Sequence, residues 1–312
     1  MKVVFMGTPD YAVETLKALI GAGHDVAAVF CQPDKPVGRK QILTPPPVKV
    51  CALENNIPVY QPLTLKDDEP KAILRDIAPD VIVVVAYGNL LPEDVLNIAK
   101  YGCVNGHASL LPKYRGASPI QWCIVCGETE TGVTTMLMDK GMDTGDILEQ
   151  ETVKIGEKET AEELFERLSV TSAELMISTL EKLEKGEITP IKQEEEKATY
   201  APIIKKEMAL IDFNKTANEV FNAVRGYYSW PCAFFFMNGK RIKVITAGVG
   251  SKTNAAAGTV VENSNNFAIA CGDGVAINIE VLQPEGSKPM TAKQFLNGNN
   301  VEIGFVVGDR NA

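Results

Sequence analysis

Two polar segments of the 312-residue chain carry the side chains best suited to chemistry. They are Asn-Gly-His-Ala-Ser-Leu-Leu-Pro-Lys-Tyr-Arg-Gly at 105–116 and Asp-Lys-Gly-Met-Asp-Thr-Gly-Asp at 139–146. His107 is one of only two histidines and stands near Asn105 in a stretch without an apolar period. If folding brings Asp143 close to these two residues, the amide, the imidazole and the carboxylate together could transfer a proton and stabilise a developing oxyanion. Asn105, His107 and Asp143 are therefore the candidate catalytic residues.

The combination of these residues with their neighbours is more specific than any one of them. Alone, an Asn at a strand end often closes a turn, and an Asp between glycines often only holds a loop. The pattern Asn-x-His-x-Ser-Leu-Leu-Pro, then Arg-Gly and later Asp before Thr-Gly, resembles the active-site signature of the 10-formyltetrahydrofolate-dependent formyltransferases. Gly106 and Ala108 depart from it, since the family usually has Val or Ile and Gly there. The resemblance runs from Met1 to about Phe305 and narrows to the members that formylate methionyl-tRNA.

The resemblance implies transfer of a formyl group from 10-formyltetrahydrofolate to the amino group of methionine on an initiator tRNA. Asn105 and His107 would donate hydrogen bonds to a tetrahedral oxyanion, and Asp143 would relay protons. No metal ion is implied, and the sequence has no histidine cluster with metal-ligand spacing. The expected cofactor is 10-formyltetrahydrofolate, acting as a co-substrate.

Two segments are expected to contact the folate because they match the family pattern. The first follows His107 and consists of Ser109, Leu110, Leu111 and Pro112. The second, Ala86-Tyr-Gly-Asn-Leu-Leu-Pro, resembles the strand end at the family's pterin pocket, with Tyr87, Gly88 and Leu90 as the expected contacts. Asn89 stands there at a position that is usually apolar. A strand-to-helix turn with Pro92 at the helix start is an alternative, and the two interpretations are compatible.

A Pro- and Gly-rich loop near residues 32–47 carries three basic residues, Lys35, Arg39 and Lys40. It resembles the segment with which methionyl-tRNA formyltransferases grip the acceptor end of the tRNA. Short single-stranded ends are held by phosphate contacts and by stacking. An ordinary solvated loop is the alternative.

Further tRNA contacts are expected in the C-terminal part. Arg225 begins an Arg-Gly-Tyr-Tyr-Ser-Trp-Pro segment that resembles a family motif, and its Trp230 is expected in the core. Lys240, Arg241 and Lys243 lie on one predicted strand, although half-solvated strand faces look the same.

The composition indicates a globular protein, with 45% hydrophobic and 23% charged residues. Seven cysteines, an odd number, favour reduced thiols and a cytoplasmic location. The Cys123-x-x-Cys126 pair is interpreted as packed helix cysteines, since no second pair completes a metal site. The N-terminus is neither a signal peptide nor a membrane span. A monomer without a membrane partner is expected.

The net charge of −9 argues against a nucleic-acid partner until its distribution is considered. Residues 207–312 contain nine Lys or Arg and nine Asp or Glu, so the deficit lies in the first 206 residues. A neutral C-terminal domain can still present a local basic face to a tRNA. Charge alone decides neither for nor against such a partner.

The first half of the chain alternates short β-branched runs with amphipathic ones. The predicted strands are Val3–Met6, Val26–Phe30, Val81–Ala86 and Gly102–Asn105. The predicted helices are Ala12–Ile20, Val48–Glu54, Lys71–Ile77 and the long amphipathic stretch 160–184. This alternation predicts an α/β fold with a doubly wound, Rossmann-like parallel sheet that binds ligands beyond the strand carboxyl ends. Asn105 falls at such an end.

The second half has a different texture. After a predicted helix at Lys215–Val224, five short predicted strands suggest a small, OB-like β-barrel. They are Phe234–Met237, Arg241–Ala247, Gly258–Val261, Phe267–Cys271 and Val275–Leu282, with turns at Asn238-Gly239 and Asp273-Gly274. The expected organisation is a formyltransferase catalytic domain at 1–189, a linker at 190–206 and a tRNA-binding domain at 207–312.

Two other functions stay open from the residues. A sugar-nucleotide N-formyltransferase, such as a UDP-aminoarabinose formyltransferase, shares the catalytic segment. A catalytically inactive folate- or RNA-binding module belongs to a different class. The Gln-Pro-Asp-x-Pro-x-Gly-Arg loop and the predicted barrel favour tRNA over a sugar nucleotide, and the intact Asn105, His107 and Asp143 argue against an inactive module.

Overall fold

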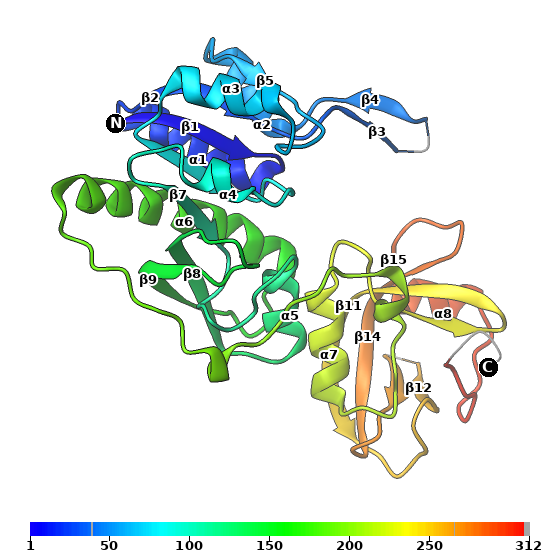
Figure 1. Cartoon of the computed structure of the whole chain (residues 1–312). Coiled ribbons are helices and arrows are strands. Elements are labelled where there is room, and N and C mark those ends of the chain that lie inside the picture. Colours follow the sequence, from blue (N-terminus) through cyan, green and yellow to red (C-terminus); the bar gives the residue numbers. More distant parts are fainter. Residues whose placement is uncertain (39, 265, 309–312) are drawn as a thin grey trace. The chain divides into compact units, whose positions relative to one another are not determined.

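The computed structural model describes residues 1–38, 40–264 and 266–308, which form two compact units (Figure 1). Unit 1 contains Met1–Pro119, Glu130–Lys154 and Phe165–Ala201, and unit 2 contains Ile120–Thr129, Ile155–Leu164 and the chain from Pro202 onward. These units depart from the expected boundaries in three stretches. Residues 120–129 and 155–164 pack with unit 2, and residues 190–201 of the expected linker pack with unit 1.

Unit 1 is built on a seven-stranded sheet with the order β5-β2-β1-β6-β7-β8-β9. The strands are β1 (Lys2–Gly7), β2 (Asp25–Phe30), β5 (Val59–Tyr60), β6 (Val81–Val85), β7 (Cys103–His107), β8 (Glu130–Leu137) and β9 (Asp146–Lys154). Pairing is parallel from β5 to β7 and antiparallel from β7 to β9. The four predicted strands are confirmed, whereas the two-residue β5 and the strands β8 and β9 were not predicted. The many Thr and Glu residues of β8 and β9 break the apolar pattern.

Helices cover both faces of this sheet, as a doubly wound fold requires. They are α1 (Asp10–Gly21), α2 (Pro47–Glu54), α3 (Asp68–Ile77), α4 (Glu93–Leu96) and α6 (Ala161–Lys185), of which α6 begins in unit 2. Tyr11 of α1 packs edge-on against Phe165 of α6, with ring centroids 5.3 Å apart. On the opposite face, Leu74 of α3 and Val95 of α4 share a buried cluster with alternate residues of β1 and β6. The predicted α/β architecture and its four predicted helices are confirmed.

Unit 2 holds a curled antiparallel sheet of the small β-barrel kind, as predicted. Its strands are β10 (Phe234–Met237), β11 (Lys240–Lys252), β12 (Val260–Asn263), β13 (Phe267–Ala270), β14 (Val275–Pro284) and β15 (Met290–Thr291). The helices of this unit are α5 (Pro119–Val125), α7 (Ala217–Gly226) and α8 (Ala292–Gly298). The predicted Asn238-Gly239 turn is confirmed, with both residues at positive φ (51° and 72°), because a tight hairpin turn needs this geometry.

A two-stranded hairpin replaces part of the loop expected near residues 32–47. Its strands β3 (Lys35–Val37) and β4 (Ile42–Thr44) pair antiparallel and project from the sheet of unit 1 (Figure 1). All described residues of both strands are exposed. Because neither face is buried, no apolar alternation marks these strands in the sequence.

Among the described residues, no helix is both long and apolar enough to cross a membrane. All seven cysteines are described and are free thiols. Cys123 lies buried in α5, as expected for a packed helix cysteine, but the same expectation for Cys126 is wrong. Cys126 follows the end of α5 and is exposed.

The cysteine environments predict a single fast-reacting thiol in the native protein. The thiolate is the reactive form, and burial raises the pKa of Cys31 to about 11 and that of Cys103 to about 12. Alkylation near pH 8, followed by mass spectrometry, should label Cys126 first. In denaturant all seven thiols should react, and fast native labelling of Cys31 or Cys103 would contradict the fold described.

Candidate active site

Asn105 and His107 lie on one face of β7, which is the last strand with a parallel neighbour. Gly106 between them faces α6, where a Cβ atom would come within 2.9 Å of Ser172 Oγ and 3.5 Å of Met176 Cε. Since side chains alternate along a strand, Asn105 and His107 point to the face opposite α6. Both are buried, with 9% and 7% of their surface exposed. The glycine that departs from the family pattern therefore lies where α6 leaves little room for a side chain.

The His107 ring has a defined orientation. Its Nε2 lies 3.0 Å from the carbonyl oxygen of Tyr114. Because a carbonyl oxygen only accepts, Nε2 carries a proton and donates to it. The other ring nitrogen, Nδ1, faces the Asp143 carboxylate, with 3.7 Å between Nδ1 and Oδ2. Nδ1 is thus the ring nitrogen that can gain or lose a proton beside this carboxylate.

Asp143 sits in a tight loop that crosses the face of β7. The loop starts where Met138 N donates to the carbonyl of Cys103, and it reaches His107 at the other end of the strand. Asp143 itself has a φ of 54°, and its Oδ2 accepts a hydrogen bond of 2.8 Å from the Gly116 backbone. A Cβ atom at Gly145 would overlap the carbonyl oxygen of Leu137. The structure therefore brings Asp143 to His107, as expected, through a backbone path that needs glycine.

Asp139 shapes the same loop from within. Its Oδ1 accepts hydrogen bonds from the Gly141 backbone (2.9 Å) and from Thr144 Oγ1 (2.6 Å). A Cβ atom at Gly141 would collide with Thr144 Oγ1. The side chain of Asp139 thus acts as a turn former, which leaves the chemistry to Asp143.

Two residues that were not among the candidate site residues hold this arrangement together. Arg115 is fully buried, and its guanidinium donates to Gln193 Oε1 (2.9 and 3.1 Å) and to the Glu195 carboxylate (2.9 Å). Gln193 Nε2 in turn donates to the carbonyls of Asp143 (2.8 Å) and Gly145 (2.7 Å). Both acceptors of Arg115 belong to the stretch expected as a linker. Their only sequence signal was a polar composition, which is also typical of solvated chain.

The segment after His107, which was expected to contact the folate, makes hydrogen bonds within the protein. Ser109 is fully buried, and its hydroxyl donates to the Lys113 carbonyl at 2.6 Å. Thr134 Oγ1 donates to the Ser109 carbonyl (2.7 Å) and accepts from Leu111 N (3.0 Å). Leu110 and Pro112 are half-buried. The polar atoms of Ser109 and Leu111 thus fasten this loop to β8.

The second expected folate segment, after β6, offers free polar atoms. Tyr87 is buried, Gly88 is exposed with a φ of 86°, and Leu90 is 76% exposed. Tyr87 Oη, Asn89 Nδ2 and Gln32 Nε2 are buried atoms without a hydrogen-bond partner among the described residues. Burial raises the pKa of Tyr87 to about 12, against a smaller opposite effect of Asn89. Buried donors without partners are uncommon in proteins and indicate a place for a polar ligand or water.

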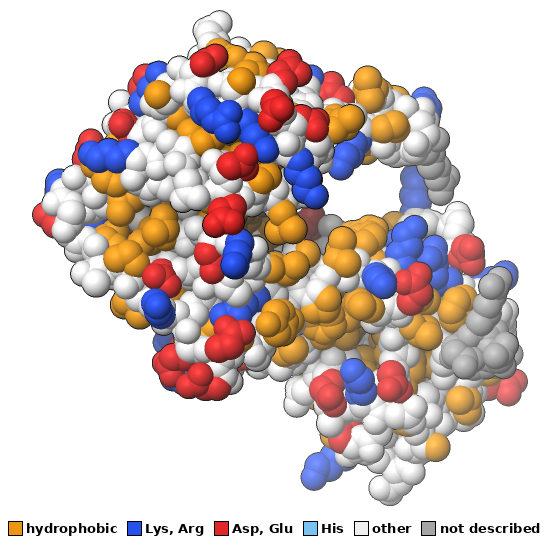
Figure 2. Space-filling model, viewed as in Figure 1, with side chains coloured by type: hydrophobic (Ala, Val, Ile, Leu, Met, Phe, Trp, Pro, Cys, Tyr) orange, Lys and Arg blue, Asp and Glu red, His pale blue; other side chains and the backbone are white. Residues whose placement is uncertain are grey.

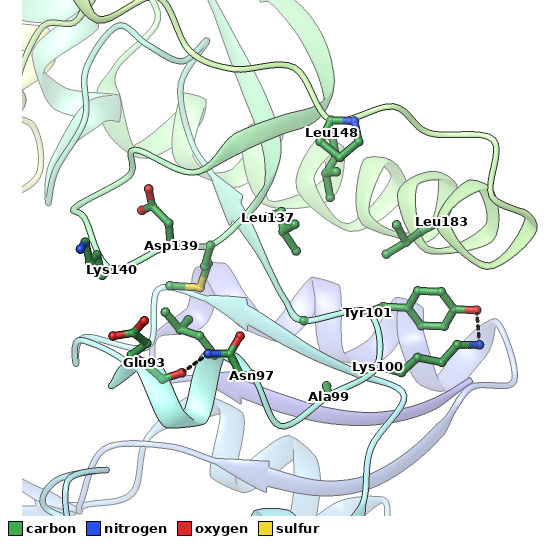
Figure 3. A pocket seen from close by; sticks show the side chains of 14 residues that line it. Glu93, Asn97, Ala99, Lys100, Tyr101, Leu137, Asp139, Lys140, Leu148 and Leu183 are labelled. Carbon is green, nitrogen blue, oxygen red and sulfur yellow. Dashed lines mark hydrogen bonds between the residues drawn. The ribbon is translucent and has the colours of Figure 1, made fainter.

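A hollow of about 650 Å³ lies at the start of β7, where the 139–145 loop begins (Figure 3). Glu93 and Asn97 line one side of it, and Leu137, Asp139 and Lys140 line the other. Asn105, His107 and Asp143 are not among its lining residues. The loop thus borders the hollow at one end and carries Asp143 to His107 at the other. Within the described residues, no group of three or more His, Cys, Asp and Glu side chains could hold a metal ion.

The β3–β4 hairpin combines positive charge with exposed apolar side chains (Figure 2). Lys35 and Lys40 are exposed, and Arg39 lies outside the described residues. Val37, Ile42 and Leu43 are 57%, 61% and 65% exposed, which is unusual for such side chains.

A polar network anchors the base of this hairpin. Lys49 Nζ donates to Asp34 Oδ1 (2.8 Å) and to Gln61 Oε1 (2.7 Å), and Gln61 Nε2 donates to the Gln32 carbonyl (2.8 Å). Two hydrogen bonds lower the pKa of the Asp34 carboxyl, and the one from Lys49 has a larger effect than the one from Gln61. The base of the exposed hairpin is therefore fixed at Asp34 to α2 through Lys49 and to the segment after β5 through Gln61.

The basic residues expected to contact tRNA in unit 2 fall into two groups. Arg241 and Lys243 share the outer face of β11 with Phe234 and Phe236 of β10, and the Arg241 guanidinium lies 5.7 Å from the Phe234 ring centroid. Lys240, the first residue of β11, is exposed. Trp230, which was expected in the core, is 56% exposed, so that expectation is wrong.

Arg225 alone forms the second group, because its guanidinium donates hydrogen bonds within unit 2. It is only 8% exposed and donates to Asn222 Oδ1 (2.9 Å) and to the carbonyls of Gly156 (3.3 Å) and Glu159 (3.2 Å). Burial lowers its pKa. This geometry does not support a tRNA contact by Arg225. Its guanidinium ties segment 155–164 to α7.

Replacing these basic residues should separate the two groups. Arg225→Ala is expected to lower the free energy of unfolding by about 1–3 kcal/mol, because buried acceptors lose their donor. Lys240→Ala, the matched surface control, should change it by less than about 0.5 kcal/mol. Chemical denaturation measures both values. If the two variants are equally stable, Arg225 returns to the candidates for surface binding.

Comparisons with known proteins show the family of this chain. Residues 1–180 match the family "Formyl transferase", and residues 203–300 match "Formyl transferase, C-terminal domain". The methionyl-tRNA formyltransferase of Lachnospira eligens is 50% identical over 99% of this chain and 100% of its own. That of Thermodesulfovibrio yellowstonii is 46% identical over 97% of both chains.

Solved structures share the fold at lower identity. A sugar 3N-formyl transferase, crystallised with dTDP and 5-N-formyl-THF, has a TM-score of 0.67 at 23% identity, over 92% of this chain and 99% of its own. An N-formyltransferase from Helicobacter canadensis, in complex with folinic acid and dTDP-3-aminofucose, has a TM-score of 0.67 at 22% identity, over 89% and 98%. The full-length similarity at about half identity is to the methionyl-tRNA enzymes. The chain thus belongs to the formyl transferase family, among its methionyl-tRNA formyltransferases.

Proposed function

We propose that this chain transfers the formyl group of 10-formyltetrahydrofolate to the amino group of methionine on initiator methionyl-tRNA. The product, formylmethionyl-tRNA, would serve translation initiation. The observation that carries the proposal is the 50% identity to a methionyl-tRNA formyltransferase over 99% of the chain, because it includes both the catalytic loops and the C-terminal unit.

The reaction sets clear demands on the protein. When bound, the folate donor supplies the formyl carbon: a C–N bond to the methionine nitrogen forms, the C–N bond to the folate nitrogen breaks, and the proton lost by the amine is matched by one gained at the folate. Negative charge develops on the formyl oxygen, so donors must point at it, and a carboxylate must handle the proton.

The three candidate residues can meet these demands. Asn105 offers amide N–H groups on the face of β7 opposite α6. His107 is held through Nε2 by the Tyr114 carbonyl, so its Nδ1 can hold or release a proton beside Asp143. The Asp143 carboxylate has one oxygen anchored by Gly116 N and can take the proton of the attacking amine. No step in this scheme requires a metal ion.

The segment after β6 fits a folate ring. The unpaired Tyr87 Oη and Asn89 Nδ2 could bind the polar edge of a pterin, and the exposed Gly88 backbone allows close approach. Leu90 would add an exposed apolar contact. In the other expected segment, we assign Leu110 and Pro112 to apolar contact, because the polar atoms of Ser109 and Leu111 already hold the loop.

For the acceptor, we propose that Lys35, Arg39 and Lys40 contact the tRNA end and that Lys240, Arg241 and Lys243 track its backbone. Phe236, which is half-buried and pairs with Arg241, supplies a ring of the kind that stacks on bases. In this scheme unit 1 carries the catalytic residues, and residues 207–312 bind tRNA. A cytoplasmic, monomeric enzyme remains our prediction, and the seven free thiols are consistent with that location.

A formyl-transfer assay with three acceptors tests the proposal directly. With 10-formyltetrahydrofolate as donor, Met-charged initiator tRNA should be formylated far faster than Met-charged elongator tRNA or UDP-aminoarabinose. Asn105→Ala and His107→Ala should each reduce turnover about a hundredfold or more, because the first variant loses a donor to the oxyanion and the second loses the ring that holds a proton beside Asp143. Folate and tRNA affinity should change little.

Each result has a defined meaning. Preference for UDP-aminoarabinose would replace the proposal with the sugar-nucleotide alternative, and folate binding without transfer to any acceptor would indicate an inactive module. Near-normal turnover in one variant would remove that residue from the mechanism.

The hairpin gives a separate prediction about tRNA. Arg39→Ala combined with Lys40→Ala should raise the KM for charged tRNA roughly tenfold, equivalent to about 1.4 kcal/mol, and should flatten its dependence on salt, because phosphate contacts release counterions. The KM for folate should hold. Lys66→Ala combined with Lys185→Ala removes the same charge from exposed positions of unit 1 and serves as the control. An unchanged KM and salt slope for tRNA in the hairpin variant would leave this loop as ordinary surface.

A further inference from the structure

We propose that Gln193 is a positioning residue for formyl transfer, acting on the Asp143 loop. The inference rests on the proposed function for its activity readouts. Gln193 lies in the stretch that resembled a linker, and it joins the buried Arg115 to the loop that carries Asp143.

The hydrogen bonds of Gln193 define its role because they use both ends of its amide. Its nitrogen donates to the carbonyls of Asp143 and Gly145, at 2.8 and 2.7 Å. Its oxygen accepts from Arg115 Nε and Nη2, at 3.1 and 2.9 Å. A flipped amide would place its oxygen against two carbonyls and its N–H groups against a guanidinium that has no acceptor, so the partners allow only this orientation.

Arg115 connects this amide to two of the three candidate catalytic side chains, His107 and Asp143. Its neighbour Tyr114 supplies the carbonyl that holds His107 Nε2, and its other neighbour Gly116 supplies the N–H that holds Asp143 Oδ2. The backbone of Arg115 is fixed in turn, because its N–H donates to the Thr199 carbonyl (2.9 Å) and its carbonyl accepts from Ala201 N (2.7 Å). Residues 193–201 therefore hold the loop after His107 through one buried arginine.

The Asp143 loop needs such a hold. Asp143 has a φ of 54°, in the left-handed region that is unfavourable for a residue with a side chain. Gln193 binds the carbonyls on both sides of Thr144 and so clamps the turn that presents the carboxylate. The distance of 3.7 Å from Asp143 Oδ2 to His107 Nδ1 is longer than a hydrogen bond, so a small shift of the loop decides whether a proton can pass.

The alternative is that Gln193 only satisfies the buried Arg115. Gln193→Glu separates the two roles, because a carboxylate still accepts from the guanidinium but has no N–H for the carbonyls of the loop. We expect kcat to fall about ten- to a hundredfold, the range that follows misplacement of a catalytic group by about 1 Å. The KM values for folate and for charged tRNA should change by less than about twofold.

A double-mutant cycle with Asp143→Asn is the decisive readout. Asp143→Asn alone should remove most activity while thermal stability stays close to wild type. If Gln193 acts through Asp143, adding Gln193→Glu to Asp143→Asn should lower kcat by less than about twofold further, because the two losses are not additive. Gln283→Glu is the matched control: Gln283 is half-buried and donates to one backbone carbonyl, that of Ser287 (2.8 Å), in a turn of unit 2. It should leave kcat unchanged.

The outcomes separate this inference from the proposed function. A kcat within twofold of wild type for Gln193→Glu, or a full additional loss on Asp143→Asn, would overturn it. Should Gln193→Glu fail to fold, Gln193→Ala replaces it, since Gln193 is half-buried and water can then reach Arg115. A wild-type protein that formylates no charged tRNA would instead overturn the proposed function. Amide hydrogen exchange over residues 139–146 then decides: faster exchange in the Gln193 variant supports the clamp, and unchanged exchange rejects it.

Discussion

The candidate site depends on the buried guanidinium of Arg115. A guanidinium does not lose its charge in a protein, so burying it is costly unless acceptors surround it. Gln193 and Glu195 supply them, and both come from a stretch that runs back over the loops of unit 1. The residues on either side of Arg115 bind His107 and Asp143. Because the buried guanidinium of Arg115 needs hydrogen-bond acceptors, it brings together three stretches that are distant in the sequence.

The strand β7 explains why these loops meet at all. It pairs parallel with β6 and antiparallel with β8. The segments after β6 and after β7 therefore leave the sheet at the same end of the strands, as in other α/β folds. The chain after β8 leaves at the opposite end, and its loop crosses the face of β7 before β9 begins. Asp143 reaches His107 only through this crossing, which needs Gly145 at its close approach to Leu137.

The basic residues that we propose to contact tRNA differ in how far their charges are exposed. The β3–β4 hairpin keeps Lys35 and Lys40 exposed while Lys49, Asp34 and Gln61 fix its base. On β11, Arg241 and Lys243 alternate with the core residues Ile242 and Val244, so their charges lie on the outer face. Arg225 shows the opposite case, because its charge satisfies carbonyls inside unit 2.

By itself, the sequence determined the local structure and the identity of the reactive groups. Apolar periods place β1, β2, β6 and the long helix α6, and the Asn238-Gly239 pair specifies its turn, because these signals act over a few residues. The types of Asn105, His107 and Asp143 indicated proton transfer and oxyanion stabilisation, and the resemblance of their segments to the formyltransferase signature implied formyl transfer. Only the tertiary structure decided that Gln193 belongs to the site and that the 32–47 loop contains a hairpin. It also decided that Trp230 is exposed and that Arg225 is buried. The reason is physical: a polar side chain has the same local signature in water and against a buried partner, and only long-range packing supplies that partner.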